Sequence, residues 1–521
     1  MDGKYYVLWG EQSKSFKMTE KLKNTILERL GIQGEKDVWD GFISPGVTSG
    51  ELNIPSIDKC ISRNNISFDS GERLYHSIGK GGADFARMLD GKGIRIVDAV
   101  VYPTEKELYC LMNNVDKDTG IIPYGGGTTV TEGLSPNNSK KYFISVDLRK
   151  MDSIVINAQD MVVNAGAGVK GPDLERELNM AGFTLGHFPE SFLHSTVGGW
   201  IATNAAGQES NRYGKMKDIV VGIKMVSPKL EIMDRMVPNQ SSYFRPMDIA
   251  VGSEGAFGIV TEATLKIRKM PKKLFYQSFI FRDFENGVRA LKELFDDGIY
   301  PLVARLSDPV ETDLSFRGIE ENMKTKIFMS YLKMRRLIQG GSLLIIVNEN
   351  GKIKQPSNSV STGKSPAKVW REGRYDRPYM YNSLLKMGVL ADTIETSAPW
   401  SKIIPIYEEV KKSFNSEIAS LGISGLIMCH LSHEYSTGSA LYFTYLFYAK
   451  NNREERLNSL RKAILTSIIQ NGGAISHHHG IGRSFKPFLR EYEGFNYELI
   501  KSIKRTLDPD DIMNPGLIDL K

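Results

Sequence analysis

Residues 123–129 read Pro-Tyr-Gly-Gly-Gly-Thr-Thr, and this stretch, more than any other, decides how the fold is interpreted. It continues from residues 120–123, a short apolar run that predicts a β-strand. Three consecutive glycines leave their backbone N–H groups accessible, and the threonine hydroxyls add donors beside them. The stretch therefore predicts a loop that cradles an anion such as a pyrophosphate. No Gly-Lys-Ser/Thr follows it, which excludes a Walker-type loop.

Glycine is concentrated in a few such stretches. The chain has 49 glycines in 521 residues, about 9%, where about 7% is usual. Residues 166–171 also match a Gly-x-Gly-x-x-Gly dinucleotide pattern between a predicted strand and a predicted helix. A dinucleotide site there would leave the clusters at 125–127, 198–199, 252–258 and 472–482 unexplained, so we interpret 166–171 as a strand-to-helix turn. Several glycine loops together indicate a backbone that closely approaches a bulky ligand.

The segments between these loops alternate between strand and helix patterns, which predicts an arrangement of mixed sheets and helices. Thr104 and Glu107 form a capping box that opens a helix to about residue 114. Residues 352–368, a Ser/Pro/Lys stretch without an acidic residue, predict a mobile loop. Strands are predicted at 94–101, 120–123, 144–148, 161–165, 219–226 and 258–267, with the last two in a second sheet, and further helices at 18–30 and 172–180.

Composition excludes several classes of protein. The 67 Lys+Arg and 61 Asp+Glu residues are interspersed and give a net charge of +6, which argues against a dedicated nucleic-acid binder. A hydrophobic content of 41% and a charged content of 25% are typical of globular proteins. No apolar run approaches the length of a membrane span, and the apolar patch at 5–10 is too short for a secretory signal. Cys60, Cys110 and Cys429 are widely spaced, which predicts reduced thiols in a cytosol-like compartment without a disulfide.

Further motifs follow the first glycine loop in a recognisable order, at 196–207, 212–218 and 252–261. From about residue 93 to 273 the chain resembles the flavin-binding half of the vanillyl-alcohol oxidase superfamily. The resemblance implies a bound FAD, with its pyrophosphate on the first loop and its adenosine and isoalloxazine lined by the later loops. The FAD is expected to be non-covalent, and neither His187 nor His194 is predicted to link it. The implied FAD contacts are Pro123, Tyr124, Gly125, Gly126, Gly127, Thr128, Thr129, Glu190, Ser191, Ser195, Thr196, Gly199, Thr203, Asn204, Ala205, Ala206, Glu254, Gly255, Gly258, Ile259 and Val260.

The C-terminal half narrows the resemblance. Motifs at 395–400, 430–433, 438–443 and 476–482 are similar to those of the alkyldihydroxyacetonephosphate synthases, and shorter matches extend into the first 80 or so residues. These enzymes replace the acyl chain of an acyl-dihydroxyacetone phosphate by a fatty alcohol, which makes the ether bond of ether lipids. The resemblance implies an α+β fold, with a two-subdomain FAD-binding domain of the PCMH type and a substrate-binding cap domain whose antiparallel sheet is flanked by helices. The expected parts are an N-terminal extension (1–92), the FAD-binding domain (93–273), the cap (274–470) and a C-terminal segment that returns to the FAD domain (471–521).

The same resemblance implies catalytic roles for Tyr442, His477, His478, His479 and Arg305. Tyr442 matches a tyrosine that gives and takes a proton, the histidine run matches one beside the flavin, and Arg305 matches an arginine needed for activity and flavin retention. Exchange at C1 of the substrate requires loss of a C1 proton and departure of a carboxylate. A phenol and imidazoles supply acid and base groups for these steps, and an arginine neutralises anionic charge.

Two positions depart from the synthase pattern. Tyr381 stands where the synthases carry an arginine that contacts the substrate phosphate, and Asn204 stands where they usually have an arginine. Tyr381 and Arg377 are expected to bind substrate, with Arg374 able to compensate for the missing charge. We therefore expect a lower affinity for a phosphorylated substrate than in the synthases with the arginine, because a phenol offers only one neutral hydrogen-bond donor.

An FAD-dependent dehydrogenase for D-lactate or glycolate is the alternative. Such enzymes commonly bind a metal through two histidines and a glutamate, but Tyr442 occupies the place of the second histidine and His478 that of the glutamate. No metal is therefore predicted, and the synthase is favoured. A non-catalytic lipid or flavin carrier is disfavoured by the intact Tyr442 and histidine run.

The expected partners are a lipid-like small-molecule substrate and a second copy of the chain in a homodimer. The protein is also expected to contact the surface of a membrane as a peripheral protein. No nucleic acid is expected to bind. A cytoplasmic location is expected because the final Asp519-Leu520-Lys521 is not a peroxisomal signal.

Overall fold

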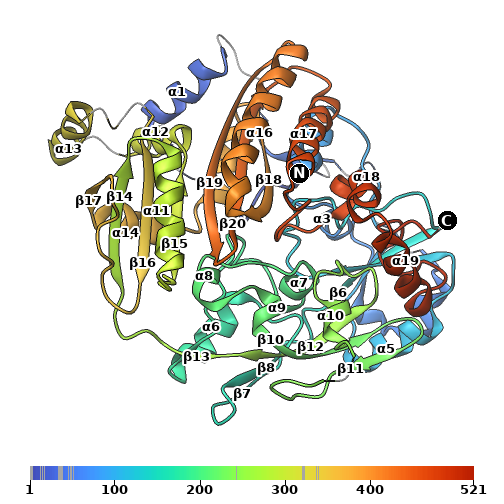
Figure 1. The fold of residues 1–521 in the computed structure, drawn as a ribbon. Coiled ribbons are helices and arrows are strands. Elements are labelled where there is room, and N and C mark those ends of the chain that lie inside the picture. Colours follow the sequence, from blue (N-terminus) through green and yellow to red (C-terminus); the bar gives the residue numbers. More distant parts are fainter. Residues whose placement is uncertain are drawn as a thin grey trace.

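The structure is a computed structural model that describes residues 4–520 apart from 12, 14, 15, 17, 33–38, 45, 47–49, 51, 242, 320–322, 336, 338 and 339. A large sheet with its helices lies above two smaller sheets in Figure 1. None of the helices in these ranges is long and apolar enough to cross a bilayer. The predicted α+β fold is confirmed.

A four-stranded sheet carries the first glycine loop. Its order is β3-β4-β6-β5, with β4, β6 and β5 parallel, so β5 ends at the edge where ligands bind in parallel sheets. Helix α5 (Glu105–Asn114) opens with the predicted capping box, in which the Thr104 N–H donates to Glu107 at 2.8 Å. Helices α2 (Pro55–Cys60) and α5 contribute to the hydrophobic core on this sheet. The strands are β3 (Ile66–Ser67), β4 (Ala99–Val101), β5 (Thr119–Tyr124) and β6 (Tyr142–Asp147).

The second small sheet is antiparallel, in the order β11-β10-β12-β8-β7. The predicted strands at 219–226 and 258–267 both belong to it, as expected, and so does the one at 161–165. Residues 166–171 form a strand-to-helix turn into α6 (Gly171–Met180), where a Cβ on Gly168 would lie 2.0 Å from the Leu148 carbonyl oxygen. Backbone therefore fills the space that a dinucleotide would need. The strands are β7 (Ile154–Asn157), β8 (Val162–Gly166), β10 (Val220–Val226), β11 (Glu231–Met233) and β12 (Ile259–Lys266).

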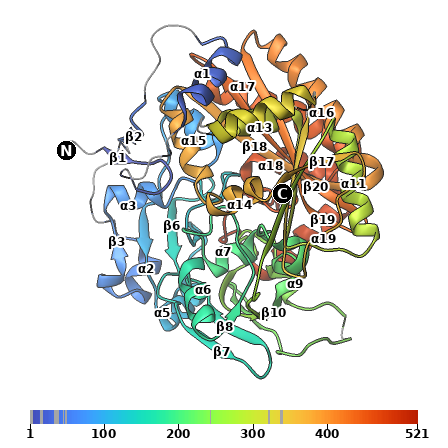
Figure 2. The ribbon, with the colours of Figure 1, turned by 90° about the vertical axis from the view of Figure 1, so that its left-hand side faces the viewer.

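The large sheet forms the predicted antiparallel cap, in the order β17-β14-β16-β15-β19-β20-β18. Figure 2 shows it nearly edge-on, with α13 (Met323–Met334), α14 (Ser365–Glu372) and α15 (Arg377–Leu385) on one side and α11 (Phe284–Asp296) and α16 (Trp400–Ser420) on the other. Alternation along β20 (Gly438–Tyr448) puts Phe443, Tyr445 and Phe447 in the core with α16, and leaves Tyr442 on the opposite face. The other strands are β14 (Phe275–Phe281), β15 (Val303–Ser307), β16 (Ser342–Asn348), β17 (Ser359–Gly363), β18 (Val389–Pro399) and β19 (Ser424–Tyr435).

Two local predictions for these sheets need correction. The segment 352–368 is not one mobile loop, because β17 pairs with β14 and Ala367 in the following helix is fully buried. The predicted strand 94–101 is regular only over β4. The cap helices are α11 (Phe284–Asp296), α12 (Pro309–Arg317), α13 (Met323–Met334), α14 (Ser365–Glu372), α15 (Arg377–Leu385), α16 (Trp400–Ser420) and α17 (Arg453–Gln470).

The first and last segments of the chain pack against elements that are distant from them in the sequence. Val7, Leu8 and residues of α4 lie in the main core of the cap, whereas Met513 pairs with Ile121 of β5. The exact domain boundaries stay predictions. The N-terminal elements are β1 (Tyr5–Tyr6), α1 (Glu20–Arg29), β2 (Phe42–Ile43), α3 (Ser70–Tyr75) and α4 (Gly82–Leu89), and the C-terminal ones are α18 (Gly482–Glu493) and α19 (Asn496–Leu507).

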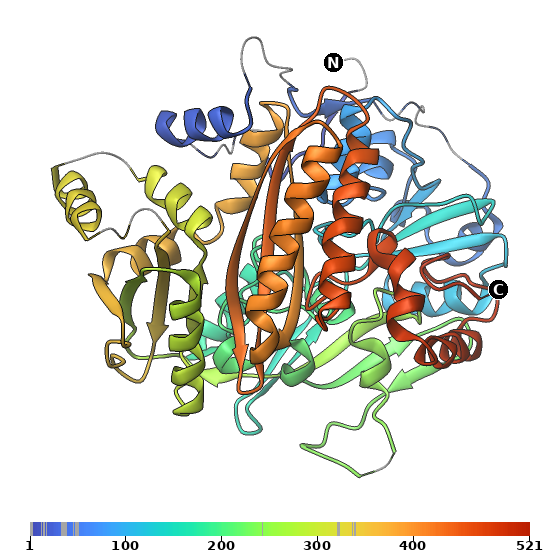
Figure 3. The same ribbon diagram turned by 45° about the horizontal axis from the view of Figure 1, so that its top comes forward.

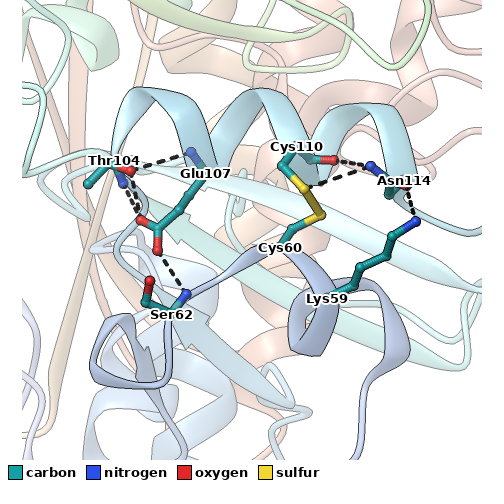
Figure 4. The surroundings of a disulfide bond; sticks show 7 residues. All are labelled: Lys59, Cys60, Ser62, Thr104, Glu107, Cys110 and Asn114. Atoms are coloured by element: carbon teal, nitrogen blue, oxygen red, sulfur yellow. Dashed lines mark hydrogen bonds between the residues drawn. A yellow bond between two sulfur atoms is a disulfide. The ribbon is translucent and has the colours of Figure 1, made fainter.

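Cys60 and Cys110 form a disulfide that joins α2 to α5, with 5.4 Å between their Cα atoms (Figure 4). The prediction of reduced thiols is therefore wrong for this pair, while Cys429 is free and buried. Sequence spacing could not reveal the pair, because the two helices meet only when both cover the same sheet. Lys59 donates to Asn114 beside it at 2.6 Å.

We expect the double substitution Cys60→Ser/Cys110→Ser to lower the free energy of unfolding by about 2–4 kcal/mol, because the cross-link restricts the unfolded chain over a sequence separation of 50. Urea unfolding without reductant measures the difference, and dithiothreitol should bring wild type down to the variant. Thiol titration of the denatured, unreduced wild type should count one free thiol, that of Cys429. A count of three would contradict the disulfide.

Candidate active site

Neighbouring strands of the cap sheet place polar side chains in one row on the same face. Glu395 of β18 and His430 of β19 are both cross-strand partners of Tyr442 in β20. His430 is also paired with Ser307 of β15, and Arg305 lies two residues before Ser307, so it points the same way. The row therefore gathers side chains that are far apart in the sequence.

The buried carboxylate of Glu395 organises the histidine loop that faces this row. It accepts hydrogen bonds from the Ser476 hydroxyl at 2.7 Å and from the backbone N–H groups of His477, His478 and His479 at 2.5, 3.0 and 2.8 Å. Burial opposes ionisation of this carboxyl, but His479, His477 and the donated hydrogen bonds lower its pKa to about 2. The loop is therefore wrapped around a charged acceptor at neutral pH.

The rings of the row and the loop lie against one another. Tyr442 stacks on His430 with ring centroids 4.8 Å apart, and it contacts His479 edge-on at 5.3 Å and His478 at 6.0 Å. Burial, and secondarily the charge of Glu190, raises the pKa of the Tyr442 phenol above its usual value. The phenol thus keeps its proton at neutral pH and can donate a hydrogen bond.

His477 links the loop to β19. Its Nε2 lies 2.6 Å from the Tyr435 hydroxyl, and its Nδ1 lies 2.9 Å from Nδ1 of His478. Burial lowers the pKa of both imidazoles well below the usual value, with Lys215 and His479 adding to the effect. Both rings are neutral at neutral pH, and a neutral imidazole can accept a proton.

Arg305 anchors the other end of the row. Its guanidinium donates to Ser307 at 3.0 Å and to Glu311 at 2.5 Å, and it lies 2.9 Å from Nδ1 of His430. Burial and the charge of Arg305 lower the pKa of His430 to about 4. Arg377, in α15, is paired with Glu190 at 3.5 Å and carries a second positive charge toward this end.

The first glycine loop lies next to the histidine loop. In the described part of the chain, the backbone N–H groups of residues 125–128 donate to no protein acceptor. A Cβ on Gly126 would lie 2.1 Å from the His194 carbonyl oxygen, so only glycine allows this close approach. The Thr131 carbonyl accepts from the Arg483 N–H at 2.9 Å, which ties this loop to the end of the histidine loop.

A cavity of about 390 Å³ opens beside Gly126 and Thr128. The N-terminal segment forms part of its lining and is held by Lys80, whose ammonium donates to the carbonyls of Val7 at 2.6 Å and Leu8 at 3.2 Å. Burial lowers the pKa of Lys80 to about 8. Free N–H donors, a cation and a cavity in one place fit an anionic group such as a pyrophosphate.

Several buried polar atoms around the two loops lack a protein partner. Among the described residues, these atoms include both ring nitrogens of His187, Nδ1 of His433 and of His479, and one carboxyl oxygen of Glu434. Buried polar groups are normally hydrogen-bonded, so these atoms fit a site that holds a polar ligand.

Glu395, His477 and His478 place one ligand atom each within 4.8 Å of one another and could hold a metal. Both carboxylate oxygens already accept backbone N–H groups, and the two Nδ1 atoms lie at hydrogen-bonding distance from each other. A cation would have to displace these contacts, and the prediction of no metal stays a prediction.

Comparison with known proteins identifies the group to which this arrangement belongs. The family described as "FAD binding domain" matches residues 97–234, and "FAD linked oxidases, C-terminal domain" matches 270–518. Alkyldihydroxyacetonephosphate synthase of Trypanosoma brucei brucei is 32% identical over 91% of this chain and 83% of the relative. The chain belongs to the alkyldihydroxyacetonephosphate synthase family of FAD-linked enzymes.

Two further comparisons are with a solved synthase structure and with a dehydrogenase. A solved alkyldihydroxyacetonephosphate synthase structure is 26% identical, covers 98% of both chains and superposes with a TM-score of 0.81. The mitochondrial D-lactate dehydrogenase [cytochrome] of Arabidopsis thaliana is 24% identical over 93% of this chain and 83% of the relative. The expected family, the enzyme class and FAD as the cofactor are confirmed, and the non-covalent mode of binding stays a prediction.

The structure brings Tyr442, the three histidines and Arg305 together, as the resemblance to the family implied. It does not bring Tyr381 there. That hydroxyl donates to the Ala391 carbonyl, and the ring packs on Phe85 at 5.4 Å, so Tyr381 is a core residue. Arg377, one helical turn earlier, is the member of this pair that lies near Arg305.

Several expected FAD contacts use their side chains within the protein. Ser195 accepts from the Trp200 indole at 2.7 Å, Thr196 caps α7 (Val197–Ala202), and Asn204 accepts from the Lys217 N–H at 3.1 Å. The Glu254 carboxyl accepts from the Ile481 N–H at 2.6 Å and so binds the histidine loop. Ile259 and Val260 are core residues. These polar atoms are therefore engaged within the protein, and the apolar side chains of Ile259 and Val260 belong to the core.

Two residues of the site were not assigned a role from sequence. Lys80 reaches the cavity from a turn after α3, and nothing in its neighbourhood in the sequence indicates a ligand. Glu395 could have been suspected, because a carboxylate in the middle of a buried strand requires charged or hydrogen-bonding partners.

We expect Glu395→Gln to lower both flavin retention and turnover. The amide keeps one acceptor oxygen, but its NH₂ group would face a backbone N–H of the histidine loop, at a cost of about 2 kcal/mol or more. Flavin absorbance after gel filtration measures the loss. Ser476→Ala, which removes one of the four donors, should give a smaller loss. Full flavin occupancy and turnover in the Gln variant would show that the carboxylate does not build the loop.

We also expect Glu434→Gln to raise the free energy of unfolding at pH 8 by about 2–4 kcal/mol and to have little effect at pH 4. Burial raises the pKa of Glu434 to about 8, so the folded chain keeps a proton that the unfolded chain releases above about pH 4.5. Stability is therefore lost as the pH rises between these values, and the amide removes the loss. Urea unfolding at both pH values tests this, with exposed Glu408→Gln as control; equal effects at pH 4 and pH 8 would disprove it.

Proposed function

We propose that this chain exchanges the acyl group of an acyl-dihydroxyacetone phosphate for a fatty alcohol, with FAD as cofactor. The observation that carries the proposal is the convergence of Tyr442 and the histidine loop on one face of the cap sheet, beside Arg305. The relatives named alkyldihydroxyacetonephosphate synthase, matched over most of the chain, support it.

The residues divide the proton transfers and the binding of the leaving carboxylate between them. A neutral imidazole of His478 or His477 takes the proton lost at C1, and the bond between C1 and the acyloxy oxygen breaks as the fatty acid leaves as a carboxylate that accepts a hydrogen bond from the protonated Tyr442 phenol. When the fatty alcohol oxygen bonds to C1, its hydroxyl proton passes to bulk water and balances the released carboxylate, and the imidazolium returns its proton to C1. When bound, FAD supplies an electron-accepting ring system next to the reacting carbon. The residues suited to hold it are those of the loop at 125–128, with Lys80 beside them.

We propose Arg377 as the group that contacts the substrate phosphate. Arg377 is partly exposed, with 30% of its side chain accessible. Its ion pair with Glu190 has an N–O distance of 3.5 Å, which is long enough for a substrate phosphate to replace the carboxylate. Arg305 is a poorer candidate because Glu311 already neutralises it at 2.5 Å.

The second candidate is a D-2-hydroxyacid dehydrogenase. The cluster of Glu395, His477 and His478 favours it, because a carboxylate with two imidazoles suits a divalent metal. The hydrogen bonds that already fill this cluster, and the lower identity to the D-lactate dehydrogenase, favour the synthase.

The lipid-like substrates of the relatives support a peripheral contact with a membrane, because long alkyl chains partition into bilayers. A homodimer and a cytoplasmic location are proposed on the sequence alone, and the Cys60–Cys110 disulfide does not favour a reducing compartment.

The test compares substrates under anaerobic conditions. The purified yellow protein should release free FAD on acid precipitation, and acyl-dihydroxyacetone phosphate with a fatty alcohol should give fatty acid without net flavin reduction. Flavin that stays on the denatured chain would contradict non-covalent binding. Stable bleaching by D-lactate, without fatty-acid release from the ester, would identify a dehydrogenase instead.

Tyr442→Phe should retain the flavin and lower turnover about 100-fold, because it removes a pre-positioned hydrogen-bond donor. Tyr448→Phe, on the same face of the same strand, is the matched control and should be near wild type. Near-normal turnover in Tyr442→Phe would mean that this tyrosine only packs.

A further inference from the structure

Helix α13 stands out from the cap at the outer end of the large sheet, as Figures 1 and 3 both show. One of its faces is anchored to the body. Leu332 is fully buried, and Phe328 and Met329 pack with it against a core that includes Ile280 and Phe316. The helix is thus held by the cap and does not need another partner to keep its place.

The opposite face of α13 carries an apolar stripe that faces solvent. The exposed fractions are 79% for Met323, 65% for Ile327, 36% for Tyr331 and 75% for Met334. At about 100° per residue these positions fall within one stripe about 80° wide. A contiguous apolar stripe of this kind, and not scattered single residues, marks an interaction surface.

The charge within α13 has one sign. Residues 323–334 contain no Asp or Glu, whereas Glu320 and Glu321 precede the helix in the sequence, and residues 324–336 carry five Lys or Arg residues. Lys333 and Arg335 are exposed next to the stripe, and the Arg335 guanidinium lies 5.6 Å from the centre of the Tyr331 ring. An apolar stripe with a basic border is complementary to a surface that is negatively charged outside and apolar beneath.

We propose that α13 binds the surface of an anionic lipid membrane. Met323, Ile327 and Met334 enter the boundary between headgroups and acyl chains, while the basic side chains contact the lipid phosphates. A second copy of this chain would be a poorer occupant, because it would bring its own basic border against this one. The inference assigns a surface to the peripheral membrane contact proposed above, and it can fail separately from the proposed reaction, since it rests on α13.

Co-sedimentation with vesicles tests the proposal on the full flavin-loaded protein. Wild type should bind vesicles of phosphatidylcholine with phosphatidylserine much more tightly than vesicles of phosphatidylcholine alone, and salt should weaken the binding. Ile327→Ser/Met334→Ser should weaken it about tenfold or more, and Lys333→Glu/Arg335→Glu at least as much, since each basic residue contributes about a fivefold change.

The matched control lies on another part of the surface. Met233, in β11, and Phe244, in the segment that follows β11, are 58% and 65% exposed, and the exposed Glu231 lies in the same strand as Met233. Met233→Ser/Phe244→Ser should bind vesicles like wild type, and all variants should keep wild-type flavin content, because the changed side chains are exposed.

The results separate the possible occupants of the stripe. Failure of wild type to bind the anionic vesicles, or unchanged binding by Ile327→Ser/Met334→Ser, would overturn the proposal. A change from dimer to monomer in that variant with vesicle binding intact would assign the stripe to a second copy of the chain. Assays with detergent-dispersed ester report on the synthase proposal separately, because they need no vesicle.

Discussion

The buried carboxylate of Glu395 is the interaction on which the site depends. Four donors converge on it from a segment 81 to 84 residues further along the chain. A neutral or apolar side chain there would leave several buried N–H groups without an acceptor, which costs more than any single contact in the loop contributes. The charge therefore specifies where the histidine loop crosses the cap sheet, and the loop in turn fixes the rings that face Tyr442.

Strand register carries this constraint across the sheet. Glu395, Tyr442 and His430 are direct cross-strand partners, so one residue of slip in β20 would turn the Tyr442 ring into the core beneath α16. The same slip would bring Phe443 to the polar face. The large apolar side chains on one face of β20 thus hold the arrangement of the candidate site on the other, so the packing of the core and the geometry of the site constrain the same strand.

The features that could be predicted from the sequence are those that local interactions determine. The capping box of α5 and the glycine loop after β5 depend on residues within a few positions of one another, and both are found as predicted. The family motifs located the tyrosine, the histidine run and Arg305. Long-range contacts could not be predicted from the sequence. The Cys60–Cys110 disulfide, the pairing of β17 at the sheet edge and the burial of Tyr381 all depend on which elements meet in the fold.

The contacts that the N-terminal and C-terminal segments make with distant parts of the chain have a consequence for the order in which the fold assembles during synthesis. Trp9 exchanges backbone-to-amide hydrogen bonds with Asn382, 373 residues later, and β5 receives Met513 as its last neighbour. The segment around Trp9 is synthesised before the cap and must wait for most of it before it can dock, and the parallel sheet is complete only when the residues around Met513 have been added. The wall of the cavity beside the glycine loop is therefore among the last parts of the fold to form, although its residues are made before those of the cap.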